Sequence, residues 1–138
     1  MKQPFSQQLF PSSSSFLYYI EEGSLGFITG VIAQHPVTGK LISGDFSAQV
    51  EQTFHNLNAL LAELGLSSHD ISRTCIQLCG YSHLEELNQL YSNYFKAPRA
   101  TVLVNTLPLN AKIQVDAVVR LKSEPQAKLQ RVKGNAQA

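Results

Sequence analysis

The feature that most constrains this chain is the alternation of apolar and polar side chains between Ala111 and Lys122. Successive side chains of a β-strand point to opposite faces of the sheet, so the run predicts a strand with one apolar face. The apolar positions are Ile113, Val115, Ala117, Val119 and Leu121. This face is suited to cover by helices, whereas the opposite face is mixed and could meet a neighbouring subunit.

Two other segments have the apolar periodicity of amphipathic helices. The first follows the candidate caps Asp45 and Ser47 and ends at Gly65, because glycine suits the left-handed position after a helix. Its apolar face consists of Val50, Phe54, Leu57, Leu61 and Leu64. The second is predicted to open with a Ser-x-x-Glu capping box at Ser82 and to end before Pro98. Its apolar face consists of Leu84, Leu87, Tyr91 and Phe95.

Further strands are predicted at residues 16–20, 26–32, 71–79 and 101–104, giving the order strand, strand, helix, strand, helix, strand, strand. Two apolar helix faces are most simply covered by one face of one sheet. The sequence therefore predicts an α+β fold, a mixed sheet with both helices packed on one face. The other face would expose apolar residues such as Val118, which is a reason for the chain to associate.

Length and charge place this domain in a broad class. The 138 residues suffice for one domain, predicted at 16–122, between a flexible segment at 1–15 and a polar tail at 123–138. The net charge is +1 without a basic block, so a nucleic-acid partner is not indicated. No apolar run approaches the roughly 18 residues needed to span a bilayer. A cytoplasmic protein without a membrane partner is therefore expected.

Cys75 and Cys79 are the two cysteines of the chain. In a strand they would lie about 13 Å apart on one face, at about 3.3 Å per residue. A disulfide needs Cα atoms within about 7 Å. Their spacing also differs from the Cys-x-x-Cys of zinc sites. We therefore expect buried structural thiols and neither a disulfide nor a metal.

Several segments, taken in order, resemble the motifs of one protein family. Gly26–Gly30 and Pro36–Lys40 are similar to its "strand, (T/S)-G-Q-I-P, D-P-x-T-G-x-L" region, and Gln52–Leu57 to its "Q-T-x-x-N-L" helix. The other matching segments are Asn88–Tyr91 with Tyr94–Phe95, Arg99–Val102, Leu107–Pro108 and Ile113–Ala117. Together they resemble the Rid family, the reactive intermediate deaminases that are also called YjgF-like proteins.

The resemblance implies a chorismate-mutase-like (YjgF-type) fold and a homotrimer with a barrel-like core and clefts between subunits. It also implies an enzyme that hydrolyses enamines and imines of 2-amino acids, such as 2-aminoacrylate, to 2-keto acids and ammonia. The small-molecule partner would be a 2-imino or 2-keto acid. No metal and no organic cofactor are implied.

The resemblance also indicates site residues. Arg99 is expected to hold the substrate carboxylate, because guanidinium offers two parallel donors; the alternative is a surface arginine that caps the second helix. Thr29 could offer a hydroxyl or main-chain donor, and Gly30 would permit close approach of the backbone. The amide of Asn88 either lines the cleft or lies on an exposed helix side. The other expected substrate-binding residues are Phe16, Ala100 and Thr101.

The chain departs from the family pattern at positions expected to be catalytic. Gln114 stands where the motif has its first glutamate, and a glutamine can orient water near Arg99 but cannot take its proton at neutral pH. Asp116 lies on the same strand face about 7 Å away, so it cannot simply replace that carboxylate. Phe16 aligns with a tyrosine and lacks its hydroxyl. These departures leave the expected fold intact and weaken the expected activity.

Two functions therefore remain open. One is a divergent deaminase in which Arg99 holds the carboxylate in an intersubunit cleft. The other is a non-catalytic Rid-like module that binds small carboxylate metabolites or regulates a partner protein. RNA cleavage, an activity of some family members, is disfavoured by the near-neutral charge and by the expected lack of a histidine–carboxylate pair at catalytic spacing.

Overall fold

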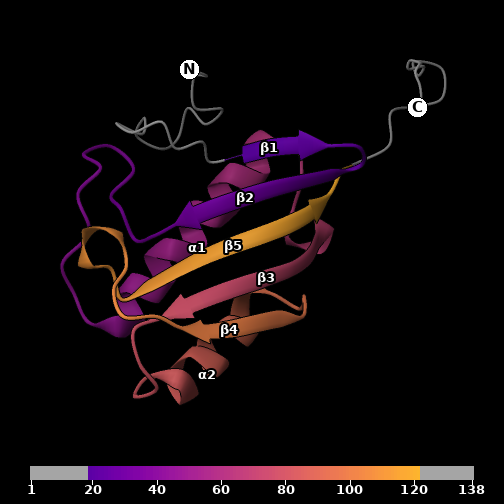
Figure 1. Ribbon diagram of the computed structural model, residues 1–138. Coiled ribbons are helices and arrows are strands. Elements are labelled where there is room, and N and C mark those ends of the chain that lie inside the picture. Colours follow the sequence, from indigo (N-terminus) through magenta and orange to yellow (C-terminus); the bar gives the residue numbers. More distant parts are fainter. Residues whose placement is uncertain (1–18, 122–138) are drawn as a thin grey trace, which may run out of the picture.

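The computed structural model describes residues 19–121, and these form a five-stranded sheet with two α-helices (Figure 1). The predicted order of strands and helices is confirmed. Along the chain the elements are β1 (Tyr19–Glu22), β2 (Leu25–Val31), α1 (Phe46–Glu63), β3 (Ile71–Leu78), α2 (Leu84–Tyr94), β4 (Arg99–Leu103) and β5 (Ile113–Arg120).

The strands lie in the order β1-β2-β5-β3-β4, so the last strand of the chain is the central one. β5 pairs antiparallel with both β2 and β3, whereas β3 and β4 are parallel and are connected through α2. The sheet is therefore mixed, as predicted. β5 has the clearest alternation because this central strand is covered by the helices on one face only, so every second side chain is buried.

Both helices cover the same face of the sheet (Figure 1), and the core lies between the two layers. Phe54 of α1 is fully buried and contacts the rings of Tyr91 and Phe95, with centroids 6.0 and 5.0 Å away. Burial of each large apolar side chain contributes about 1.5–3 kcal/mol. No helix within residues 19–121 is long and apolar enough to cross a membrane.

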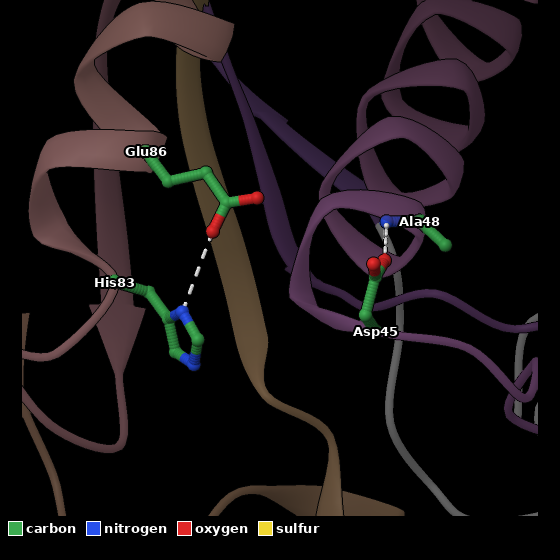
Figure 2. A network of polar contacts seen from close by, with 4 residues as sticks. All are labelled: Asp45, Ala48, His83 and Glu86. Carbon is green, nitrogen blue, oxygen red and sulfur yellow. Dashed lines mark hydrogen bonds and ion pairs between the residues drawn. The ribbon is translucent and has the colours of Figure 1, made fainter.

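Polar side chains of α1 fix the loops around the sheet. Asp45 caps the helix by accepting a 3.0 Å hydrogen bond from the Ala48 N–H (Figure 2). Buried Asn56 donates to the carbonyls of Ile32 and Gln34, and the side chain of Gln49 accepts from a main-chain N–H near the start of β5. These bonds satisfy backbone groups that the sheet leaves unpaired, so the polar residues of this helix are structural.

The start of α2 differs from the prediction. The helix begins at Leu84 with His83 as its N-cap residue, and Ser82 forms no capping box. The His83 ring stacks on buried Phe46 at 4.4 Å between centroids, and its Nδ1 lies 3.4 Å from Glu86. These contacts hold His83 in place, so the N-cap lies one residue later than the sequence motif indicates.

The face of the sheet away from the helices has no cover within the described chain. Phe27 and Val118 form a cross-strand pair on it, and Val102 is 43% exposed. Cys75 is only half-buried because it belongs to this face, and Cys79, beyond the end of β3, is exposed. The prediction of buried thiols is therefore wrong for the single chain, although both cysteines are free.

Candidate functional site

Arg99 is the first residue of β4, and its guanidinium is held against α2. Its Nε donates to the Thr101 hydroxyl at 2.9 Å, and its Nη2 donates to Oδ1 of Asn88. Its Cζ lies 4.9 Å from the centroid of the Tyr91 ring, within the range of a cation–π contact. The structure thus joins three residues that the sequence indicated separately, and adds a tyrosine beneath them.

Tyr91 is itself fixed from below. Its hydroxyl lies 2.8 Å from the hydroxyl of buried Thr74 and donates to the Ala97 carbonyl at 3.0 Å. Burial raises the pKa of Tyr91, although the Thr74 hydrogen bond and the charge of Arg99 act in the opposite direction. The phenol therefore stays protonated in the physiological range, and the ring is a rigid platform for the guanidinium.

Asn88 contacts Arg99, a role that neither alternative from the sequence included. Its side chain is on the exposed part of α2, as one alternative required, but its carbonyl oxygen accepts from Arg99. Asn88 thus orients the arginine. The alternative in which Arg99 caps α2 receives no support from these contacts, because its donors go to side-chain oxygens.

A second polar cluster lies on the open face of the sheet. Gln114 of β5 faces Gln77 of β3 as a cross-strand pair, and its Nε2 donates to Oε1 of Gln77 at 2.9 Å. Nε2 of Gln77 lies 3.3 Å from Oδ2 of Asp116. Oδ1 of Asp116 accepts from the Gly30 N–H at 2.7 Å. Gln77 thus bridges the distance between Gln114 and Asp116 that the sequence predicts.

Gly30 lies in a β-bulge of β2, where the pairing with β5 shifts between Ile28 and Val31. Its φ is +69°, a left-handed conformation that residues with a side chain adopt only at a cost. Thr29 precedes it in the bulge. The bulge therefore aims the Gly30 N–H at Asp116, which gives this glycine a structural reason besides the expected close approach to a ligand.

The two clusters lie on opposite faces of the sheet. Arg99 contacts α2, on the covered face, whereas Gln114 is flanked by the buried Ile113 and Val115 and so points to the open face. Ala100, which pairs with Cys75, shares the open face with Gln114. Within one chain Gln114 therefore does not lie near Arg99, and their meeting in a cleft between subunits stays a prediction. Phe16 is outside the described residues.

A cavity of about 330 Å³ opens at the far end of β3, between the starts of the two helices. Its lining residues include Phe46, Cys79, His83, Asn110 and Lys112. Figure 2 shows Nδ1 of His83 turned toward Glu86 and the other ring nitrogen pointing away. The expected lack of a histidine–carboxylate pair is therefore wrong. The cavity contains none of the predicted site residues.

Sequence reasoning missed Gln77 and Tyr91. Tyr91 belongs to the matched motif and to the predicted apolar face of α2, and that pattern predicts only a role in packing. Gln77 is a polar residue in an otherwise apolar part of the strand Ile71–Leu78, a pattern that can indicate a functional side chain. What the pattern could not supply was the register that places Gln77 opposite Gln114.

The fold and these clusters define a class, a small α+β protein with an arginine held against its second helix and an open sheet face. Residues 7–121 match the family model described as Endoribonuclease L-PSP. The chain therefore belongs to this family, which includes the Rid or YjgF-like proteins, and its YjgF-type fold is confirmed.

Relatives and a solved structure agree with this family. A RutC family protein of Aquifex aeolicus (strain VF5) is 39% identical over 104 residues, which are 72% of this chain and 82% of that protein. The Reactive Intermediate Deaminase A, chloroplastic, of Arabidopsis thaliana is 34% identical over 105 residues, 74% of this chain and 56% of that protein. The crystal structure of yeast Mmf1 has a TM-score of 0.78 at 27% identity, covering 86% of this chain and 98% of its own.

Proposed function

We propose that this protein hydrolyses 2-imino acids and the enamines from which they form, such as 2-aminoacrylate, to 2-keto acids and ammonia. The observation that carries the proposal is the held guanidinium of Arg99. The name of the Arabidopsis relative, a reactive intermediate deaminase, supports the same reaction class.

The geometry of Arg99 suits a carboxylate. A guanidinium has five N–H donors. One donates to Thr101 and one to Asn88, so three of the five, two on Nη1 and one on Nη2, have no acceptor among the described residues. The outer edge formed by Nη1 and Nη2 offers two parallel donors, the arrangement that binds a carboxylate in bidentate fashion. Stacking on Tyr91 leaves the guanidinium little freedom to lose on binding.

The complete site is proposed to form between copies of the chain. Arg99 and Gln114 face opposite sides of one sheet, so one protomer cannot bring both to a small substrate. The open face carries Phe27, Val102 and Val118, apolar residues that association would cover. The proposed assembly is a homotrimer in which Arg99 of one protomer faces Gln114 of another across a cleft.

The chemistry needs water to add to the imine carbon and ammonia to leave. Arg99 holds the carboxylate beside that carbon and withdraws electron density from it, and Gln114 orients the attacking water. The carbon–oxygen bond forms as the attacking water gives one proton to solvent and the imine nitrogen takes one from it, which leaves a hydroxyl and an amine on the same carbon. The tetrahedral intermediate then loses ammonia as the new hydroxyl loses its proton. No cofactor is required, because every bond change is an acid–base step.

The non-catalytic alternative has its own observation. Gln114 cannot accept a proton at neutral pH, and both N–H groups of its neighbour Gln77 are engaged in hydrogen bonds. A site without a carboxylate at this position could bind a 2-keto acid or a similar metabolite without catalysing a reaction.

The test is ammonia release from freshly generated 2-aminoacrylate, measured with pyruvate binding on the same protein. Release faster than the spontaneous rate supports the deaminase. Pyruvate binding without release favours the binding module. If neither is seen, Arg99 is not an anion site. Light scattering at micromolar concentration is the control for assembly, and a stable monomer would rule out the shared cleft.

A further inference from the structure

We propose that Asp116, acting through Gln77, locks the amide of Gln114 with its carbonyl oxygen toward the ligand. The site would then select ligands that donate a hydrogen bond at C2, such as 2-imino acids, over 2-keto acids, which only accept one there. This inference rests on the proposed function, because it names the ligand that the same site prefers.

The direction of the hydrogen bonds follows from the chemistry of the last group in the chain. An ionised Asp116 can only accept, and one of its oxygens is already filled by the Gly30 N–H. Gln77 must therefore turn its NH₂ group toward Asp116, at 3.3 Å, and toward Sγ of Cys75, at 3.2 Å. Both of its N–H groups are thus engaged.

The amide of Gln77 then leaves only its oxygen for Gln114. An acceptor at this position requires a donor, so Gln114 presents Nε2 to it at 2.9 Å. The remaining end of the Gln114 amide is Oε1, to which no residue in the described range 19–121 donates. The negative charge of Asp116 thereby determines, through Gln77, that Gln114 exposes its oxygen.

An exposed acceptor discriminates between substrate and product. The imine N–H of the substrate can donate to Oε1, whereas the oxygen that replaces it in the product meets another acceptor. One hydrogen bond gained or lost changes affinity by roughly 3- to 10-fold. The same contact would weaken product binding after ammonia has left. Asp116 and Gln77 are thus positioning residues, since neither needs to touch the ligand.

Lactate and pyruvate are suitable probes, because both are monoanions of similar size and only lactate has a donor at C2. In calorimetry the wild type should bind lactate roughly 3- to 10-fold more tightly than pyruvate. Gln77→Met, which keeps the charge of Asp116, should bring this ratio close to one. Asp116→Asn should do the same, because its amide no longer dictates the orientation of Gln77. The proposal is overturned if wild type prefers pyruvate, or if the ratio survives in both variants.

A second readout separates this inference from the proposed function. In ¹⁵N-labelled protein, the side-chain amide signals of Gln114, identified by their loss in Gln114→Met, should shift in both Gln77→Met and Asp116→Asn. We call the hydrogen bonds from Asp116 through Gln77 to Gln114 the relay. If neither lactate nor pyruvate binds but the signals shift, the relay exists and the carboxylate site is wrong. If the signals stay in place in both variants, the relay is refuted whatever binds. A shift in Asp116→Asn alone refutes the path through Gln77.

Discussion

The two faces of the sheet hold their functional groups by different means. On the covered face, Arg99 lies on an aromatic ring that the core anchors, and its neighbours come from the same chain. On the open face, Gln114 is oriented by a line of side-chain hydrogen bonds between strands, without a helix above it. The comparison shows that contacts within one chain are enough to hold a charged group in place, whereas a polar group on the open face is held by hydrogen bonds between strands alone.

The largest effect is expected from Gln114→Glu, which changes only the open face. If turnover is limited by the missing base, the rate of ammonia release should rise, and a positioned base contributes about 10²- to 10⁴-fold. The new carboxylate faces Oε1 of Gln77 and lies on the same face as Asp116, so repulsion should raise its pKa. The gain should therefore appear as the pH rises through that pKa.

The control for Gln114→Glu is a separate measurement of pyruvate affinity, because the new carboxylate could instead bind Arg99 of a neighbouring protomer. Weaker pyruvate binding without faster turnover would indicate that competition. An active wild type whose rate the substitution leaves unchanged would mean that Gln114 needs only to orient water.

The next effect concerns the covered face. Arg99→Lys should weaken the binding of pyruvate by roughly 10- to 150-fold, because a point charge cannot make two parallel hydrogen bonds and a charged bond contributes about 1.5–3 kcal/mol. Arg120→Lys is the matched control, since Arg120 is exposed and bonds only to Ser72 and His69 among described residues. Unchanged binding in the Arg99 variant would make that residue structural.

Tyr91→Phe tests whether the Tyr91 hydroxyl stabilises the fold, since the substitution keeps the ring that contacts the charge of Arg99. The ring beneath Arg99 remains, but the buried Thr74 loses its side-chain partner, which should cost about 1–3 kcal/mol of unfolding free energy. Urea denaturation measures this loss. Tyr94→Phe is the comparison, because among residues 19–121 the Tyr94 hydroxyl makes its hydrogen bond with exposed His55 alone and should matter little. Equal losses would contradict the anchoring role of Tyr91.

The smallest effect is expected from Gly30→Ala, at about 1–2 kcal/mol of stability, because alanine resists the left-handed conformation. Gly23→Ala serves as control, since its φ of +63° carries the same penalty at a turn with open space around it. Both variants should lose similar stability in urea. Only Gly30→Ala should also reduce the preference for lactate over pyruvate. A reduction in both variants would mean that the hydrogen bond from Gly30 to Asp116 does not specifically orient Gln114.

The sequence predicts the fold well because its information is local. The alternation in β5 and the apolar faces of the two helices determine which surfaces must be covered, and the order of elements then leaves few topologies. The start of α2 was predicted wrongly because the stacking of His83 on Phe46 joins segments far apart in the chain.

The site was less predictable, because it too depends on contacts between segments far apart in the chain. The motif resemblance identified Arg99, Asn88 and Thr101, and the structure brings these together. It also places Arg99 and Gln114 in one cleft between subunits, which stays a prediction, and within one chain the sheet keeps them on opposite faces. Strand polarity and register decide that separation, and neither can be read from spacing along the chain.

The placement of these two residues on opposite faces has a consequence for inheritance. In the proposed assembly, an Arg99 defect and a Gln114 defect damage different halves of each cleft. A cell that makes one chain of each kind would assemble mixed trimers, in which an intact arginine meets an intact glutamine at some interfaces. Two inactive alleles would then complement each other, although neither would support activity alone.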